Sequence, residues 1–493
     1  MSKKLLVIIC SLCMLVSLVG CGGNNNDTTP KSSSETQSSL TQSTQQSTEQ
    51  SVQQSTPQSS ATVEYESVEI STANATKVYF EGSKISTAGI FARVKVNGLN
   101  STLPANKLDI IIPNNASELG KHTIVVKVGS YESSFDINVI KKPVVSNNEI
   151  KIKVDTTYTG AMSDVDSLGY SQFASLNDAF TALKGAFDDA VVKTIQLCDQ
   201  TYNEKVSFNI KNVHIYGVKG GSTKISYGDC ADTAGGTDNS ATFTCKGEGL
   251  WVTDVIFENS YDYLNDKTYS NKQAVAALIE ADKCVFNNCT FLGYQDTLEP
   301  KAGRQYYKNC TIKGCIDYIF GKNATALFET CNIVTLYRPG DEYCITAHMG
   351  NNGNKGQGVP TYGYVFKNCV LSVEGEVGVG RVTLGRPWRA DATVAWINCE
   401  MSEHISKSAY GESGVRPRYN SMEGGGANNL PQDAHFVEFG NTGLGAMNEA
   451  VLGFTMAQNA DDYTLANIFA TTNGLVTYTG EFNAQQILQG LMA

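Results

Sequence analysis

Two aspartates stand 21 residues apart in the C-terminal half of the chain, each beside a run of strand-forming residues. Asp296 lies in "GYQDTL" (293–298) and Asp317 lies in "CIDYIFG" (315–321). If the two carboxyl groups lie close together, they cannot both ionise cheaply, so one of them should hold a proton near neutral pH. An ionised acid beside a protonated one can act as a nucleophile beside a general acid.

Side chains of two other kinds accompany this pair. Gln295 adjoins Asp296, and Gln273, in "QAVAAL", comes 22 residues before Gln295. Two amide donors next to two carboxylates can stabilise an oxyanion. Arg386, in "LGRPW", can pair with one carboxylate and keep it ionised. The alternative is two surface aspartates on a strand edge and a solvated arginine, and the spacing alone favours neither interpretation.

A repeat of about 21 residues indicates how these side chains can meet. Hexamers similar to "FNNCTF" recur along the chain, and the cysteines in three of them, Cys289, Cys310 and Cys331, are 21 residues apart. Cys369 and Cys399 follow after longer gaps, which imply insertions. A fixed period with one short strand per copy predicts a solenoid, and β-branched and aromatic strands favour a parallel β-helix. The chain is thus expected to be all-β in its larger part.

Stacked turns bring residues that are one period apart into line. Asp296 and Asp317 are therefore expected on neighbouring turns, on one surface of the solenoid, with their backbones roughly 5 Å apart. Gln273 belongs to the preceding turn. The segment 175–189 interrupts the strand pattern, because Ser175 and the acid three residues later have the spacing of a capping box. Its apolar residues recur at helical spacing, which predicts a helix that caps the N-terminal end of the solenoid.

The cysteine count bears on the compartment and on the core. The chain has 14 cysteines, of which Cys10, Cys13 and Cys21 precede the folded part. Exported proteins can form disulfides, so pairing is one interpretation of the other eleven. Their odd number and the regular column favour buried thiols stacked in a ladder.

The N-terminal segment has the pattern of an export signal. Residues 1–20 combine two lysines with an apolar stretch, and "LVGC", which ends at Cys21, resembles the lipobox of bacterial lipoproteins. An ordinary signal peptide with a chance cysteine is the alternative. Residues 21–62 are almost entirely Ser, Thr, Gln, Asn and Gly, a composition that predicts a disordered tether. The protein is therefore expected on the extracellular face of the cell membrane, held by a lipid on Cys21.

Residues 63–142 have a different texture from the repeat. Short alternating or β-branched runs are broken by Gly, Asn or Pro, which predicts a small antiparallel sandwich. The pattern resembles the bacterial immunoglobulin-like domains appended to surface enzymes. A spacer is the main interpretation, and carbohydrate or cell-wall binding is the alternative. The repeat domain then occupies residues 150–493.

Charge and histidine content exclude two classes of partner. Lys and Arg number 38 and Asp and Glu number 49, a net charge of −11, which argues against nucleic acid. His348 has no second His or Cys at ligand spacing, so no metal site is expected.

Five motifs, in chain order, resemble those of the pectin methylesterases: "QTYNEKV", "QAVAAL", "GYQDTL", "DYIFG" and "LGRPW". The resemblance spans about residues 155–470. It implies a right-handed parallel β-helix that hydrolyses galacturonate methyl esters in pectin without cofactor or metal. It also implies methylesterified homogalacturonan as the partner, and a monomer is expected.

The resemblance assigns roles to the polar residues. Asp317 matches the nucleophile, and Asp296 matches the acid that protonates departing methanol and then activates water as a base. Gln295 and Gln273 match the residues that stabilise the oxyanion, and Arg386 matches the arginine paired with the nucleophile.

The same resemblance assigns Phe320 and Trp388 to the walls of the cleft. The chain departs from the family pattern at several positions near the motifs, which leaves the subsite preference open: Gln200, Ala277, Glu299, His348, Met349 and Gly350.

Three rival functions share the expected fold. A pectate lyase or polygalacturonase would carry a different set of charged residues, and a lyase would need Ca²⁺ carboxylates. A non-catalytic pectin-binding surface protein would have no use for the complete set of catalytic side chains. A related esterase or thioesterase on another substrate remains the main alternative.

Overall fold

The computed structural model describes residues 63–340, 342–350, 361–424, 427–474 and 476–492. Segment 1–20, Cys21 and the tether 21–62 lie outside the described residues, so export, lipidation and tethering stay predictions. In the described part of the chain, no helix is long and apolar enough to cross a membrane.

Residues 67–140 form two small sheets of three and four strands. The three-stranded sheet has the order β1 (Ser67–Ser71), β3 (Phe91–Val96), β4 (Leu99–Pro104). The four-stranded sheet has the order β2 (Val78–Phe80), β7 (Tyr131–Ile140), β6 (Gly120–Val128), β5 (Asp109–Ile111). Every pairing is antiparallel except β2 with β7. The strands lie inside the range expected for a sandwich, and the likeness to immunoglobulin domains stays a prediction.

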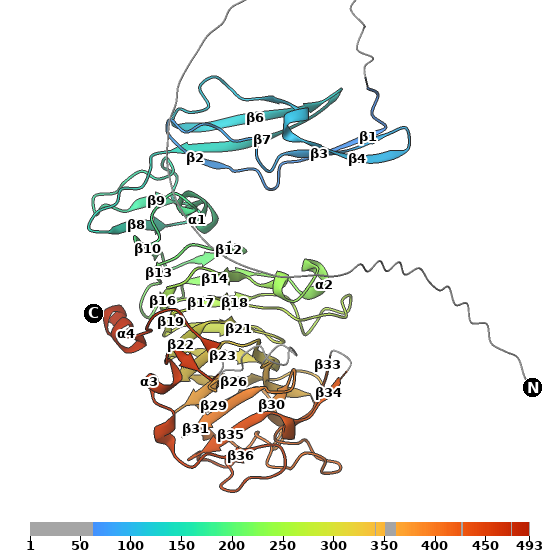
Figure 1. Ribbon diagram of the computed structural model, residues 1–493, viewed down its shortest axis with the longest axis vertical. Helices are drawn as coiled ribbons and strands as arrows, with labels where there is room; N and C mark the ends of the chain where they lie inside the picture. Colours follow the sequence, from blue (N-terminus) through green and yellow to red (C-terminus); the bar gives the residue numbers. More distant parts are fainter. Residues whose placement is uncertain (1–62, 341, 351–360, 425–426, 475, 493) are drawn as a thin grey trace, which may run out of the picture. The chain divides into compact units, whose positions relative to one another are not determined.

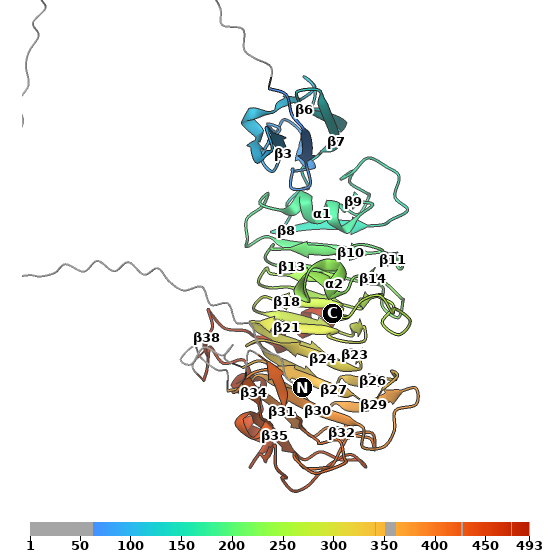
Figure 2. The same cartoon turned by 90° about the vertical axis from the view of Figure 1, so that its right-hand side faces the viewer.

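The chain from Glu149 onward winds into three long parallel sheets, which Figures 1 and 2 show as a ladder running from β8 to β36. Each full turn adds one strand to each sheet, so the parallel β-helix predicted from the repeat is confirmed. The expectation of one strand per copy is wrong, because each turn holds three strands.

The strands of the three sheets lie side by side in chain order, except that β9 is the edge strand of the twelve-stranded sheet and β8 lies between β9 and β10. The seven-stranded sheet holds β12 (Val206–Phe208), β15 (Phe243–Cys245), β18 (Ala277–Glu280), β21 (Leu298–Ala302), β24 (Ile316–Gly321), β27 (Tyr343–His348) and β30 (Val382–Pro387). The eight-stranded sheet holds β11 (Thr201–Tyr202), β14 (Lys224–Tyr227), β17 (Ile256–Asn259), β20 (Thr290–Leu292), β23 (Thr311–Gly314), β26 (Asn332–Leu336), β29 (Val370–Glu374) and β32 (Glu400–Met401).

The twelve-stranded sheet holds β8 (Glu149–Val154), β9 (Ser171–Phe173), β10 (Val192–Leu197), β13 (Val213–Tyr216), β16 (Trp251–Thr253), β19 (Cys284–Asn287), β22 (Arg304–Lys308), β25 (Thr325–Glu329), β28 (Tyr364–Lys367), β31 (Thr393–Ile397), β35 (His435–Phe439) and β36 (Thr455–Met456). Smaller elements are two hairpins, β33 (Met422–Gly424) with β34 (Ala427–Asn429) and β37 (Thr472–Asn473) with β38 (Val476–Thr477). Short helices are α2 (Ala231–Ala234), α3 (Leu465–Ile468), α4 (Ala484–Met492), η1 (Ala105–Lys107), η2 (Asp238–Ser240), η3 (Pro431–Asp433) and η4 (Ala460–Asp462).

The repeating hexamer is a bend between two strands. In "FNNCTF", β19 ends at Asn287, Asn288 takes a positive φ of 52°, and β20 begins at Thr290. Asn and Asp enter this left-handed region more easily than other side chains do. The same bend recurs with positive φ at Asp254, Asn288, Asn309, Thr330, Asn368 and Asn398. The asparagine column therefore turns the chain from the twelve-stranded sheet into the eight-stranded sheet.

Two ladders fill the core behind these bends. Five of the bend residues, from Asn288 onward, are each followed by a cysteine that is buried and carries a free thiol, as expected. Three residues before each cysteine an aromatic ring stacks on that of the next turn, with centroid distances of 4.9, 4.6, 4.6 and 3.9 Å. The stacked rings are Phe286, Tyr307, Phe328, Phe366 and Trp396. This regular core keeps successive turns in register.

The predicted helix is α1 (Leu176–Leu183), which packs against β8 and β9 at the first end of the twelve-stranded sheet. The Ser175 hydroxyl accepts a hydrogen bond from the Asp178 backbone N–H at 3.3 Å, so the N-cap is confirmed. The helix ends six residues before the predicted residue 189, because Lys184 is extended and Gly185 has a φ of 65°.

Candidate active site

The predicted polar residues meet in one cavity on the outer face of the seven-stranded sheet. Its volume is about 440 Å³. The cavity is lined by all of the predicted catalytic and cleft residues, namely Gln273, Gln295, Asp296, Asp317, Phe320, Arg386 and Trp388. The repeat period therefore predicted correctly that Asp296 and Asp317 lie on aligned neighbouring turns.

Asp296 and Asp317 lie on neighbouring turns. Gln295 pairs with Ile316, and the Asp296 backbone N–H donates to the Ile316 carbonyl at 3.0 Å, which aligns the two aspartates. Both have positive φ, 63° at Asp296 and 47° at Asp317. They face outward, yet only 8% and 5% of them is exposed, so the alternative of two surface aspartates is wrong. The cavity walls remove both carboxyl groups from bulk water.

Arg386, on β30, holds Asp317 through two parallel hydrogen bonds. Its Nε donates to Oδ1 at 2.8 Å and its Nη2 donates to Oδ2 at 2.6 Å, the geometry of a strong arginine–carboxylate pair. The Nη1 atom donates to Glu342 Oε1 at 3.0 Å. Burial lowers the pKa of Arg386, but the ion pair with Asp317 outweighs burial and the pKa is raised overall. The guanidinium therefore stays charged and stabilises an ionised Asp317.

Asp296 is in the opposite electrostatic situation. Burial raises the pKa of Asp296 well above its usual value, and the negative charge of Asp317 raises it further. The guanidinium of Arg386 opposes this shift only in part. These effects favour a protonated Asp296 beside a charged Asp317, an arrangement in which one acid could act as a general acid and the other as a nucleophile.

Gln273 and Gln295 lie on successive turns, and Gln295 immediately precedes Asp296. The Ala274 backbone N–H donates to the Gln295 carbonyl at 3.0 Å, which joins the segment of Gln273 to the next turn. Oε1 of Gln273 is buried and has no hydrogen-bond partner within the described structure. Gln273 lines the cavity, and its Oε1 is not held by a neighbouring protein group.

Aromatic and apolar side chains form the opposite wall. The rings of Phe320 and Trp388 lie 6.1 Å apart between centroids, at an angle of 52°. They belong to one apolar cluster with the half-buried Met422. An apolar wall of this kind can pack against the apolar face of a bound ligand.

His348 lies on β27 outside the cavity lining. It is fully buried, and burial lowers its pKa to about 3. Its Nδ1 accepts a hydrogen bond from the Thr393 backbone N–H at 2.9 Å, a structural role. Among the described residues, no group of three or more His, Cys, Asp or Glu is placed to hold a metal ion.

Sequence reasoning missed Ala347 of β27 and four residues that lie outside the strands of the repeat. Thr237 and Asp238 reach the cavity from a loop and η2, and Met422 reaches it from the hairpin β33–β34. Glu342 bonds Arg386 from the start of β27. These four residues lie in insertions that do not follow the period, so spacing carried no signal for them.

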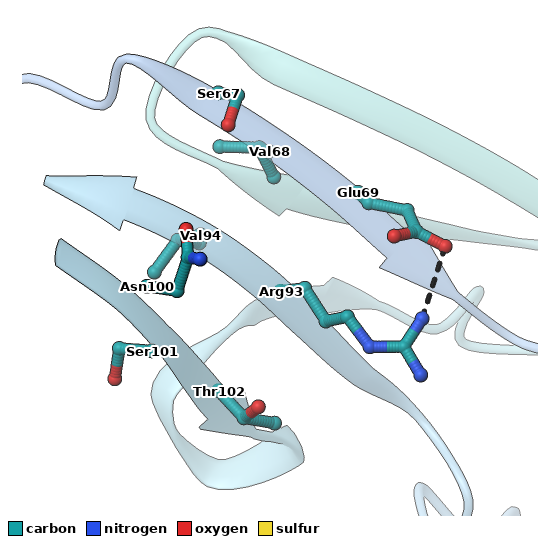
Figure 3. Close-up of a pocket in the computed structure, with 8 residues that line it drawn as sticks. All are labelled: Ser67, Val68, Glu69, Arg93, Val94, Asn100, Ser101 and Thr102. Carbon is teal, nitrogen blue, oxygen red and sulfur yellow. Dashed lines mark hydrogen bonds and ion pairs between the residues drawn. The ribbon is translucent and has the colours of Figure 1, made fainter. Parts of the chain in front are cut away.

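A second cavity of about 420 Å³ lies on the three-stranded sheet of β1, β3 and β4 (Figure 3). It is lined by short polar side chains and by an exposed ion pair between Arg93 and Glu69 at 3.2 Å. Its lining has no aromatic ring and only one acid, so it lacks the features of the first cavity.

Comparisons with known proteins agree with this geometry. The family model described as Pectinesterase matches residues 163–473. A protein of Aspergillus flavus named "Probable pectinesterase A" is 33% identical over 295 residues, which cover 57% of this chain and 85% of that protein. The solved pectin methylesterase from Yersinia enterocolitica is 27% identical, with a TM-score of 0.51, and the match covers 60% of this chain and 98% of that one. Pectin methylesterase PemA from Erwinia chrysanthemi shares the fold, with a TM-score of 0.54 at 22% identity over 68% of this chain and 99% of that one.

Proposed function

Because the chain belongs to the pectinesterase family and is a carboxylic ester hydrolase, we propose that it hydrolyses galacturonate methyl esters in pectin and releases methanol. The observation that carries the proposal is the clamped Asp317 beside the buried Asp296 in a single cavity with an aromatic wall. A solved pectin methylesterase of the same fold holds a hexasaccharide, which supports an oligosaccharide as the ligand of this cavity.

The first half of the reaction forms a covalent intermediate. A carboxylate oxygen of Asp317 attacks the ester carbonyl carbon, and the carbonyl oxygen becomes an oxyanion. The amides of Gln273 and Gln295 donate hydrogen bonds to that oxygen. The bond to the methoxy oxygen then breaks, Asp296 gives its proton to that oxygen, and methanol leaves an acyl-Asp317 anhydride.

The second half returns the enzyme to its starting state. Asp296 is now a carboxylate, and it removes a proton from a water molecule that attacks the acyl carbon. The anhydride bond breaks, Asp317 is released as a carboxylate paired with Arg386, and the galacturonic acid product gives up its carboxyl proton to solvent. Both aspartates regain their original protonation states, so no cofactor is consumed.

A substrate panel tests the proposed function. Purified protein is offered methylesterified pectin, a pectate of low ester content and acyl thioesters, and methanol or thiol release is measured. Methanol release from the esterified polymer alone is expected. Thiol release without methanol would replace pectin by a thioester substrate, and binding without turnover would indicate a pectin-binding surface protein.

Mass spectrometry tests the covalent step. A rapid acid quench during turnover is expected to leave an acyl adduct on the peptide that contains Asp317. An adduct on the peptide of Asp296 alone would exchange the roles of the two aspartates.

Localisation is a separate proposal that rests on residues 1–62. Export by segment 1–20 and lipidation of Cys21 would place the enzyme at the extracellular face of the cell membrane, with residues 22–62 as a tether. Cys21→Ser is expected to move the enzyme from the membrane fraction to the medium with methanol release intact. Unchanged fractionation would contradict the lipid anchor.

A further inference from the structure

Glu299 is a buried acid that the proposed mechanism does not use. It lies on β21, three residues after Asp296, and it is 0% exposed. Neither of its carboxylate oxygens has a hydrogen-bond partner within the described structure. Burial of an unpaired carboxylate is costly. We therefore expect the Glu299 carboxyl group to be protonated, unless its negative charge has a function.

The sheet register places Glu299 in the apolar wall of the active-site cavity. Leu278 pairs with Glu299 on the preceding turn, and Leu298 pairs with Ile319 on the next, which aligns Glu299 with Phe320. Leu278 and Phe320 belong to the cluster that also contains Trp388. Glu299 thus lies in one column with the apolar side chains of the wall, between Leu278 and Phe320.

The charged groups around Glu299 do not form an ion pair with it. On its own strand, Lys301 donates to Asp238 of η2 at 2.5 Å and lies 3.7 Å from Glu280 of β18. Lys322 follows β24. Its positive charge lowers the pKa of Glu299, whereas the negative charges of Asp238 and Glu280 raise it. From β28, the Tyr364 hydroxyl donates to the Pro300 carbonyl at 2.8 Å. Burial raises the pKa of Glu299 to about 8, with Asp238 as the next cause.

We propose that Glu299 is a positioning residue that keeps the acid proton on Asp296 as the pH rises. When Glu299 ionises inside the apolar wall, its negative charge opposes a second negative charge on Asp296 across a medium that screens poorly. Asp296 then stays protonated, and able to protonate the leaving methanol, to a higher pH than the Asp317 charge alone would allow. The inference rests on the proposed function, and it gives Glu299 a role beside Asp296 and Asp317.

The pH profile of Glu299→Gln tests the inference. Glutamine keeps the shape of the protonated acid but never acquires its charge. We expect the alkaline limb of kcat/KM for methanol release to move to lower pH, by about half a unit or more. The acidic limb and KM at pH 6 should not move. An alkaline limb that stays in place, or one that moves to higher pH because ionised Glu299 inhibits the wild type, would overturn the proposal.

Two further variants separate charge from packing. Glu280→Gln removes a partly exposed acid one turn away, beside the same lysine, and should leave the alkaline limb in place. Glu299→Leu removes the unpartnered oxygens and fits between the two apolar neighbours. Its alkaline limb should also move to lower pH, so this variant can replace Glu299→Gln if the glutamine variant does not fold.

An infrared titration makes the inference independent of turnover. The carbonyl band of a protonated carboxyl is followed with pH, and Asp296→Asn assigns the Asp296 component. In Glu299→Gln, Asp296 should lose its proton at lower pH than in the wild type. If this shift occurs but no methanol is released from pectin, the proposed substrate fails and the role of Glu299 stands. If methanol is released and the Asp296 component does not move, the inference fails alone.

Discussion

Two bends of the β-helix use the same backbone conformation for different purposes. At the bend between the twelve-stranded and eight-stranded sheets, Asn309 and Asn368 have φ of 53° and 54°. At the bend that leads into the seven-stranded sheet, Asp296 and Asp317 have φ of 63° and 47°. The first bend repeats along the solenoid, whereas the second carries an acid on two turns only. The repeating bend builds the fold, and the unrepeated one builds the site.

The residues around each bend explain this difference. Behind the asparagine bend lie the cysteine and aromatic ladders, which offset the cost of a left-handed residue, about 1–2 kcal/mol without a favourable side chain. At the aspartate bend, the same conformation aims two carboxyl groups into one cavity, where Arg386 meets them. A strained residue at a functional site is compatible with folding when its surroundings fix it in this way.

The largest expected effect follows from Asp317→Asn. Asparagine adopts positive φ as readily as aspartate and its carbonyl can accept from Arg386, but its amide is a poor nucleophile. Methanol release should fall at least about a thousandfold, with the circular dichroism spectrum unchanged. Asparagine is preferable to alanine here, since alanine would add backbone strain and leave the Arg386 charge facing only Glu342. A variant that keeps a tenth of the wild-type rate would remove Asp317 from the nucleophile's role.

A smaller effect is expected at the structural bend. Asn368 is exposed and has a φ of 54°, so Asn368→Ala should lower the free energy of unfolding by about 1 kcal/mol. Asn368→Gly is the matched control, because glycine adopts positive φ freely and should lose less. Both variants should release methanol at the wild-type rate below their unfolding temperatures. Urea unfolding measures the first effect, and equal losses for Ala and Gly would show that φ is not what selects asparagine.

The same contrast explains what the sequence could predict. The period aligned Asp296 with Asp317 because register in a parallel sheet carries a side chain column from turn to turn. It could not show that the hexamer contains a bend, since apolar residues flank the asparagine on both sides and look like one strand. Asp238 and Met422 come from irregular insertions, so no register relates them to the acids. The burial of both aspartates also depends on those insertions, so the spacing alone could not exclude two surface aspartates.

The smallest expected effect is at Cys310, the residue that follows a structural bend. Its thiol is buried and contacts the Phe286 and Lys308 carbonyls at 3.5 and 3.4 Å, which are weak interactions for sulfur. Valine already occupies the equivalent place at Val255, after the bend at Asp254.

Cys310→Val should therefore change the free energy of unfolding by less than about 1.5 kcal/mol and leave methanol release unchanged. Cys310→Asp is the contrasting variant. It places an acid in the apolar ladder with no arginine partner, so it should not fold, although Asp317 is tolerated one bend further along the chain. Urea unfolding and methanol release distinguish the outcomes. A folded Cys310→Asp variant would show that a buried acid on these turns is tolerated without the cavity and without Arg386. The proposed difference between the two bends would then be wrong.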